Sequence, residues 1–325
     1  MAIDLLAIEP HKVSRDLSGY ITYIFGRGGI GKTTLATRAP KALLLATEKG
    51  YNALPGIIPQ DITSWSELRQ VQRELKKPAV KERFQTVIVD TVDLAAAMCE
   101  KYICSQNDVE KIGEIPYGQG WNLLKREFED VFRSIAQMGY ALFFISHDKD
   151  KTFKREDGTE YNQIVPTCGS SCGDIVKNMV DIMAYAHQKV IDGVPKRILT
   201  FRSLDGSIDC KSRFRYMPAS VELSYENLVN ALNEAIDKEA SENGNQFVTD
   251  KREESVKAEL KPFSELLTDF QTITSNIMAT KGQDSAASIV AIVERFLGKG
   301  KKVGECIERQ YEVVALIVDE LKTLL

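Results

Sequence analysis

Short apolar runs alternate with longer amphipathic stretches over the first two thirds of the chain. An apolar run bounded by polar residues predicts a buried strand, whereas apolar positions three and four residues apart predict a helix. We expect strands at 20–25, 42–46, 84–89 and 140–146, and helices at 64–76, 93–105 and 121–138. Ser64 is the expected N-cap of its helix, with Glu67 as its capping-box partner. This alternation predicts an α/β fold with a central, mostly parallel sheet.

The pattern changes after residue 146. Two stretches, 151–156 and 160–165, flank Asp157-Gly158, and this arrangement predicts a β-hairpin. Three further runs predict strands that extend the sheet, at 179–186, 197–201 and 208–214.

The last third of the chain departs from strand–helix alternation. Residues 238–261 are polar and charged and include Asn243-Gly244-Asn245, which predicts a linker. Residues 262–325 read as purely helical, so we expect a core at 1–237, a linker at 238–261 and a small all-α domain at 262–325. One apolar stripe has alternating steps of four and three and consists of Ile307, Tyr311, Val314, Val318, Leu321 and Leu325. It predicts helix packing, either within the domain or in a short intersubunit coiled coil.

Candidate chemistry begins at residues 26–33, which fit the phosphate-binding pattern GxxxxGK[ST]. The preceding strand and a helix expected at 34–38 supply the context that a P-loop needs, which disfavours a glycine-rich turn without chemistry. Glycines let backbone N–H groups surround a phosphate. Lys32 would contact the β- and γ-phosphates, and the Thr33 hydroxyl would bind Mg²⁺. The nucleotide-contacting residues are expected to be Gly26, Arg27, Gly28, Gly29, Ile30, Gly31, Lys32, Thr33 and Thr34.

An acidic residue after a buried strand is the second part of an ATP site. The strand at 84–89 leads into Asp90, a Walker B carboxylate that would hold Mg²⁺ together with Thr33. Asp93, one turn later, is the less favoured ligand. ATP and Mg²⁺ are therefore the expected cofactors.

Hydrolysis also needs a group that orients or deprotonates water. Glu48 follows the strand at 42–46, which we expect beside the P-loop strand, so its carboxylate would project at the nucleotide edge. A solvated loop glutamate is the alternative. His147 ends the next strand and is either a γ-phosphate sensor or a structural hydrogen-bonding residue.

Lys211 and Arg213 are two cations at positions i and i+2 of an expected strand, so they share one face. Such a face suits an arginine finger placed against a neighbour's ATP. A solvated basic strand is the alternative, and spacing alone favours it.

Composition and charge limit the partners and the location that we expect for the protein. The net charge of -4 gives no overall attraction to nucleic acid, and the apolar runs are too short to span a bilayer. Without a secretion signal at the N-terminus, we expect a cytosolic location, where the six cysteines would be free thiols. Cys168 and Cys172 could bind zinc with His147 or His187, although the spacing fits no common signature.

In this order, the P-loop, Glu48, Asp90, Ile145-Ser146-His147 and Lys211-x-Arg213 resemble the RecA-like core ATPases. The resemblance is strongest to the phage single-strand-annealing recombinases of the RadB-like Sak group, also described as phage nucleotide-binding proteins. Residues 12–19 and 117–121 also look typical, and the similarity covers about residues 10–235.

This resemblance implies roles for the candidate residues. Glu48 would be the catalytic glutamate, His147 the γ-phosphate sensor, and Lys211 and Arg213 paired fingers that reach the nucleotide of an adjacent subunit. A homo-oligomer with nucleotide at its subunit interfaces is therefore expected. Residues 1–19 are too short for the docking segment of full-length RecA proteins, so a ring or short oligomer stays open.

In RecA-like proteins the loops that correspond to 106–120 and 148–174 face DNA. The second loop carries cations with interleaved aromatic residues, a common recipe for single strands: Lys149, Lys151, Phe153, Lys154, Arg155 and Tyr161. Five acidic residues nearly balance this charge, so a solvated hairpin is the alternative. Lys299, Lys301 and Lys302 form a second basic cluster.

The leading hypothesis is an ATPase that binds single-stranded DNA for annealing or pairing, encoded by a phage or prophage, in the bacterial host cytosol. A single-strand-binding protein is the expected partner, and no membrane is involved. One alternative is a partitioning ATPase, whose P-loop reads KGGxGKT, although Arg27 replaces the first lysine. Others are a helicase loader or packaging ATPase, and a nucleotide-gated interaction module.

Overall fold

The computed structural model of the protein describes residues 9–244, 247–252, 261–282 and 284–325. The chain forms two compact units. The core unit is Pro10–Glu254, and the helical unit lies within Ser255–Leu325. No helix of the described residues is both long and apolar enough to cross a membrane.

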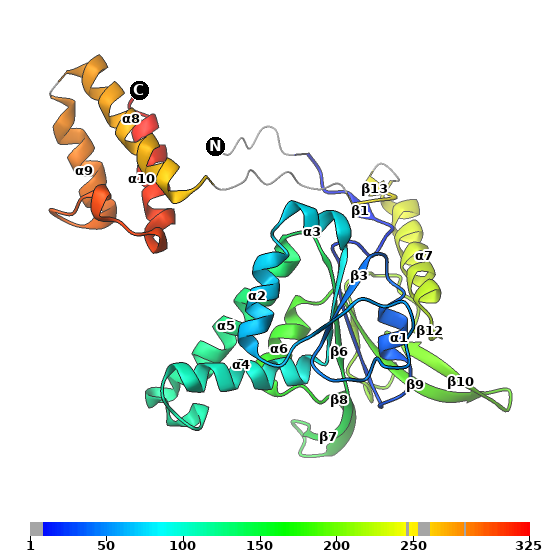
Figure 1. The fold of residues 1–325 in the computed structure, drawn as a ribbon. Helices are drawn as coiled ribbons and strands as arrows, with labels where there is room; N and C mark the ends of the chain where they lie inside the picture. The colour runs from blue at the N-terminus through cyan, green and yellow to red at the C-terminus, as the bar shows by residue number, and fades with distance from the viewer. Residues whose placement is uncertain (1–8, 245–246, 253–260, 283) are drawn as a thin grey trace. The chain divides into compact units, whose positions relative to one another are not determined.

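A nine-stranded sheet forms the centre of the core unit (Figure 1). Six neighbouring strands, from β9 to β4, run parallel, whereas β10 and β11 pair antiparallel with β9, and β12 pairs antiparallel with β10. Strands β2, β5 and β6 are buried at every position, as in parallel sheets covered on both faces. In spatial order the strands are β12 (Ser220–Glu222), β10 (Val194–Thr200), β9 (Ile182–Ile191), β2 (Ile21–Gly26), β6 (Ala141–Ser146), β5 (Thr86–Asp90), β3 (Ala42–Ala46) and β4 (Pro59–Asp61), with β11 (Lys211–Ser212) paired to β9.

Helices cover both faces of the sheet (Figure 1). One apolar layer packs α1 (Lys32–Ala36) and α7 (Tyr225–Asn243) on the sheet. The other packs α2 (Trp65–Glu74), α4 (Val92–Gln106), α5 (Gln119–Gln137) and α6 (Ser170–Met179). The short helices α3 (Pro78–Arg83), η2 (Ile112–Glu114) and η3 (Pro116–Gly118) lie in the connections. This confirms the predicted α/β class with a mostly parallel sheet.

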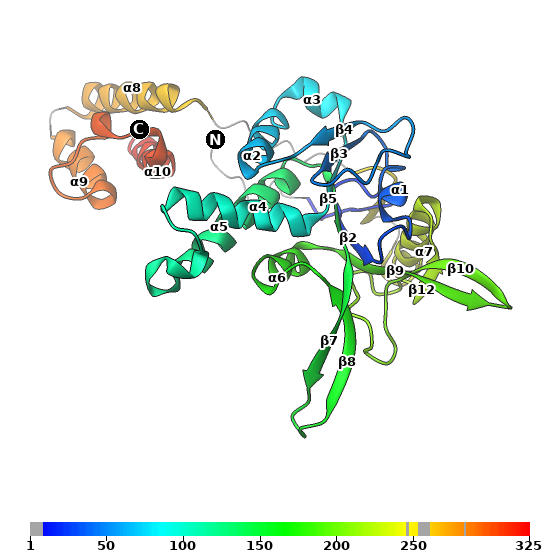
Figure 2. The same cartoon turned by 60° about the horizontal axis from the view of Figure 1, so that its bottom comes forward.

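Two local predictions, the N-cap of α2 and the β-hairpin, are confirmed by the structure. The Ser64 hydroxyl caps α2 by accepting from the Glu67 backbone N–H at 3.3 Å. The Glu67 carboxylate accepts from the N–H of Thr63 at 2.7 Å, one residue before the N-cap. The predicted hairpin also forms, from β7 (Asp148–Lys154) and β8 (Glu160–Pro166), and it projects away from the sheet (Figure 2).

Several predicted bounds are wrong. The strand at 42–46 does not lie beside the P-loop strand, because β5 and β6 stand between β3 and β2. The strand predicted at 179–186 begins later, since α6 continues to Met179. Of 208–214, only Lys211–Ser212 is a strand. The helix after the P-loop begins at Lys32 instead of residue 34.

The predicted linker at 238–261 is partly regular structure. Helix α7 continues to Asn243, and β13 (Val248–Thr249) pairs in parallel with β1 (Val13–Ser14). Arg15 joins this clasp by ion pairs to Asp237 at 2.7 Å and Asp250 at 2.9 Å. Residues 245–246 and 253–260 of the predicted linker lie outside the described residues.

The helical unit consists of α8 (Phe263–Lys281), α9 (Ser285–Leu297) and α10 (Tyr311–Lys322), with the short helices η5 (Val303–Glu305) and η6 (Glu308–Gln310) between the last two. Of the predicted stripe, Val314, Val318 and Leu321 are buried in the unit's own core. Its two ends, Ile307 and Leu325, are exposed. The middle of the stripe is therefore intradomain core.

Candidate nucleotide-binding site

The P-loop connects β2 to α1, and two glycines shape it. Gly26 has a φ of 153°, and a Cβ added there would lie 2.1 Å from the Ala186 carbonyl oxygen on β9. Gly31 has a left-handed φ of 112° and is the N-cap of α1, with no side chain capping the helix. Only glycine fits both demands. A loop of this kind at the start of a helix can direct backbone N–H groups toward a phosphate.

Lys32 is buried inside this loop. Its ammonium donates to the carbonyl oxygens of Gly26 at 2.6 Å and Arg27 at 2.9 Å. Burial lowers the pKa of Lys32, and the nearby Asp90 carboxylate opposes that shift. The cation is thus held where the P-loop pattern requires one.

Thr33 and Asp90 meet beside the lysine. The Thr33 hydroxyl donates to Asp90 Oδ2 at 2.6 Å, and Asp90 ends β5 with only 5% exposure. Burial raises the pKa of Asp90, and the Thr33 hydrogen bond counters that shift. A hydroxyl and a buried carboxylate are the oxygen donors that Mg²⁺ prefers. These two side chains therefore fit a magnesium ion, and they would hold it.

Glu48 and His147 come together at the same edge although their strands are not neighbours. His147 Nε2 lies 4.0 Å from Glu48 Oε1, and the side chains are 42% and 39% exposed. The preceding Thr47 holds the turn in place, since its hydroxyl accepts from the Thr91 N–H at 2.7 Å. Because parallel strands end at one edge, the order β3–β5–β6–β2 still brings Glu48, Asp90, His147 and the P-loop together.

The hairpin is attached to this edge at both ends. Where β7 begins, Tyr185 donates its hydroxyl proton to Asp148 at 3.1 Å. Just beyond β8, the Thr167 hydroxyl donates to Asp93 Oδ1 at 2.6 Å and lies 3.2 Å from the Ser146 hydroxyl. Asp93 is therefore engaged with the hairpin base, which agrees with Asp90 being the preferred magnesium ligand.

Arg197 on β10 is a site residue that sequence reasoning missed. One of its guanidinium nitrogens lies 3.4 Å from the Ile30 carbonyl oxygen. It lines a cavity of about 530 Å³ together with Arg27, Tyr185 and His187. The rings of Tyr185 and His187 stack on each other, with their centroids 4.9 Å apart. No local sequence signal could have found Arg197, because the contact joins residues far apart in the chain.

The sequence pattern of the AAA domain family matches residues 18–214. This stretch contains the P-loop, Asp90, Glu48 and His147. The chain belongs to the AAA domain family. It is a P-loop ATPase domain with a helical unit after it.

A relative and a solved structure are also similar to this AAA-domain protein. The SPbeta prophage-derived uncharacterized protein YorG of Bacillus subtilis (strain 168) is 31% identical over 333 residues, which cover 100% of this chain and 99% of the relative. The crystal structure of a KaiC-like protein from the hyperthermophilic archaeon Pyrococcus horikoshii is 12% identical. It matches with a TM-score of 0.34 and covers 58% of this chain and 80% of its own.

Lys211 and Arg213 of this AAA-domain protein lie at the opposite edge of the sheet. Arg213 pairs with Asp181 at 3.2 Å and donates to the Asn178 carbonyl at 2.9 Å, and Lys211 donates to the Lys177 carbonyl. Asp181 precedes β9, whereas Ala186 on β9 pairs with Gly26. Asp181, which holds Arg213, and Ala186, which lies beside the P-loop, are thus five residues apart along the strand, or roughly 17 Å. Arg213 therefore cannot reach the phosphates bound by its own P-loop.

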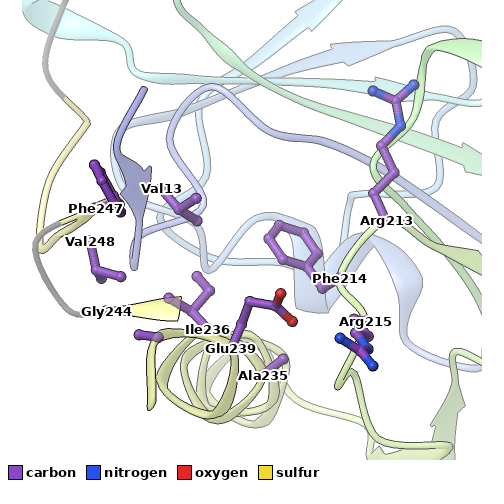
Figure 3. A pocket seen from close by; sticks show the side chains of 11 residues that line it. Val13, Arg213, Phe214, Arg215, Ala235, Ile236, Glu239, Gly244, Phe247 and Val248 are labelled. Atoms are coloured by element: carbon purple, nitrogen blue, oxygen red, sulfur yellow. The ribbon is translucent and has the colours of Figure 1, made fainter. Parts of the chain in front are cut away.

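Arg213 also stands at the rim of an apolar cavity of about 370 Å³ between the β1–β13 clasp and α7 (Figure 3). Val13, Phe214 and Ile236 face one another across it, and the Arg213 side chain extends away from them. The Arg213 side chain is 55% exposed despite its ion pair.

The cysteines of the zinc hypothesis are buried in the sheet's helical layer. Burial raises the pKa of Cys172 to about 12 and that of Cys168 still further, so both are protonated thiols near neutral pH. In the part of the chain that the structure describes, no three His, Cys, Asp or Glu residues form a group that could hold a metal.

Replacing Lys32 with alanine should weaken ATP binding by at least about a hundredfold, because charge-assisted hydrogen bonds contribute about 1.5–3 kcal/mol each. Calorimetric titration with ATP and Mg²⁺ measures the change. Lys49→Ala is the matched control, since Lys49 is an exposed lysine near the same edge. Unchanged affinity in Lys32→Ala would contradict the assignment of the loop.

Proposed function

We propose that the protein is an ATP-dependent recombination protein that binds single-stranded DNA and anneals or pairs complementary strands. The β7–β8 hairpin is the observation that carries the proposal. It projects from the nucleotide edge and starts at Asp148, directly after His147 (Figure 2). A movement of His147 in response to the γ-phosphate would therefore be transmitted directly along the backbone to the hairpin.

The two faces of the hairpin differ in charge, because side chains alternate along a strand. Lys149, Lys151 and Phe153 share one face of β7, and Phe153 pairs with Tyr161 of β8. The acidic residues Asp148, Asp150 and Glu160 take the other face, together with Lys154. Lys154 was expected from the sequence to contact DNA with the other cations, and it is therefore left out of the proposed binding face. Positive and negative side chains that nearly balance along the sequence thus lie mostly on opposite faces. This separation favours a binding face over a uniformly solvated hairpin.

Aromatic rings and cations are interleaved on the basic face. The Phe153 and Tyr161 rings stack with centroids 5.6 Å apart. Lys151 Nζ lies 4.8 Å from the Phe153 ring centre, and the Arg155 guanidinium lies 4.7 Å from that of Tyr161. Single strands are bound by such combinations, in which cations contact phosphates and rings stack on bases.

Chemistry at the nucleotide edge follows from the residues gathered there. Lys32 would stabilise the charge on the β- and γ-phosphates, and Glu48 would orient the attacking water. His147, beside Glu48, would sense the γ-phosphate. Mg²⁺, held by Thr33 and Asp90, would neutralise phosphate charge.

A homo-oligomer completes this site. Arg213 lies too far from its own P-loop to act there, yet it is half exposed on the opposite edge. A neighbouring copy would present its nucleotide to Arg213 and Lys211, which would act as fingers in trans. We further propose a single-strand-binding protein as partner, and a role in the cytosol of a bacterial host, in line with the prophage-derived relative.

The two faces of the hairpin give the test of DNA binding. Lys151→Glu combined with Phe153→Ala should weaken binding of a labelled single-stranded oligonucleotide by tenfold or more, since one stacked base contributes about 1–3 kcal/mol. Lys154→Glu, on the other face, is the matched control and should change affinity much less. Fluorescence anisotropy measures both. An equal loss in Lys154→Glu, or no binding by the unmodified protein, would contradict the proposal.

A further inference from the structure

The helical unit carries a surface groove whose lining is mostly apolar. The groove lies between α8, α9 and the loop that follows α9, with a volume of about 370 Å³. Phe270, Ile289, Val290, Val293 and Val303 form this apolar groove. Val290 is 53% exposed although it is a large apolar residue at the centre of a helix. Val290 therefore adds exposed apolar surface to the concave site, and contiguous exposed apolar surface is typical of binding sites.

Two lysines of the loop after α9 line the groove, Lys301 and Lys302, and Lys299 lies two residues before them. We call these three lysines the basic rim. The turn that presents them has left-handed glycines at Gly298 and Gly300, with φ of 95° and 75°. The Gly300 N–H donates to Glu294 Oε1 at 2.8 Å, so the carboxylate that lines the groove is engaged by the backbone.

All three lysines of the basic rim are exposed, and within the described residues their side chains make no ion pair or hydrogen bond. Of the other described lysines of the unit, Lys261 and Lys322 each pair with an aspartate, and Lys281 makes no ion pair. The charged residues of the lining are two lysines, Lys301 and Lys302, and one carboxylate, Glu294, which leaves an excess of positive charge. Exposed cations without an ion-pair partner beside an apolar groove are complementary to a ligand that is acidic and also carries an apolar side chain.

We propose that this groove binds an acidic peptide segment of a partner protein. One large apolar side chain of the segment fills the groove, and flanking carboxylates contact Lys299, Lys301 and Lys302. This division of labour is typical of peptide sites, in which a buried anchor gives affinity and charges give orientation and rate. The inference is independent of the function proposed for the nucleotide edge.

A peptide fits the groove better than a nucleic acid does. Bases are bound by stacking on exposed rings. Phe270 is the aromatic residue of the lining, and it is half-buried against the core of the unit. The volume of the cavity is also within the range of about 300–1,000 Å³ found for small-ligand pockets.

The test uses the full-length protein and a fluorescein-labelled synthetic peptide of consecutive aspartates ending in phenylalanine. Anisotropy should show saturable binding. Binding should fall by tenfold or more when alanine replaces the phenylalanine, and similarly when asparagines replace the aspartates. Lys301→Glu and Val290→Asp should each weaken binding by a comparable factor.

Matched controls separate the groove from general charge effects. Lys281→Glu makes the same charge reversal at an exposed lysine outside the groove, and Leu316→Asp changes an apolar residue that is equally exposed at 56%. Both controls should bind the peptide as the unmodified protein does. Absence of peptide binding, equal loss in the controls, or insensitivity to the phenylalanine would overturn the proposal. Lysine-dependent binding of a single-stranded oligonucleotide at this groove, with no peptide binding, would overturn it in favour of a nucleic-acid site.

Discussion

Replacing Glu48 with glutamine should slow ATP hydrolysis by about 10²–10⁴-fold, the usual contribution of a general base, while ATP binding stays unchanged. The substitution keeps the size of the side chain and removes only its ability to accept a proton from water. Glu48 Oε1 lies 4.0 Å from His147 Nε2, and both side chains are partly exposed. Steady-state phosphate release at saturating ATP measures the effect.

Glu82→Gln is the matched control, because Glu82 is an exposed glutamate outside the nucleotide edge. It should leave turnover unchanged. If Glu48→Gln hydrolyses ATP at the unmodified rate, the water is activated elsewhere and the role assigned to Glu48 is wrong.

Replacing Arg213 with alanine should also slow ATP hydrolysis, by about 10³-fold or more, which is the usual contribution of an arginine finger to phosphoryl transfer. ATP binding should persist, because Arg213 is separated from its own P-loop by roughly 17 Å of strand. Arg215→Ala is the control, since Arg215 lies two residues away and is 70% exposed. Thermal unfolding checks that loss of the Asp181 ion pair has not destabilised the core.

Mixing the two inactive variants tests action in trans. In a mixed oligomer, a Glu48→Gln subunit supplies Arg213 to a neighbour that retains Glu48. Part of the activity should therefore return on mixing. If activity stays absent in verified mixed oligomers, or if Arg213→Ala is active alone, the finger assignment fails.

Local patterns predicted most of the nucleotide edge. The P-loop and the Walker B strand are continuous in sequence, and their chemistry needs residues at fixed spacing. Thr33 and Asp90 accordingly meet at 2.6 Å. The hairpin was also predicted, because Asp157-Gly158 specifies a turn through local backbone preferences.

Long-range pairings escaped prediction for a physical reason. Strands β1 and β13 have only two residues each, so neither carries a periodic signal. Their pairing also joins the beginning and the end of the core unit's sequence. The contact between Arg197 and Ile30 likewise depends on the order of strands in the sheet. That order also placed β3 two strands further from β2 than expected. Polar composition suggested a linker where α7 continues to Asn243, because tertiary packing stabilises a helix beyond its local preference.

The most direct measurement is steady-state ATP hydrolysis by the purified full-length protein, alone, with single-stranded DNA and with duplex DNA. Our account predicts clear stimulation by single strands and a much smaller response to duplex, with stimulation lost in Lys151→Glu combined with Phe153→Ala. Hydrolysis that is indifferent to single strands, or that rises only with duplex, would contradict the proposed role in strand annealing or pairing.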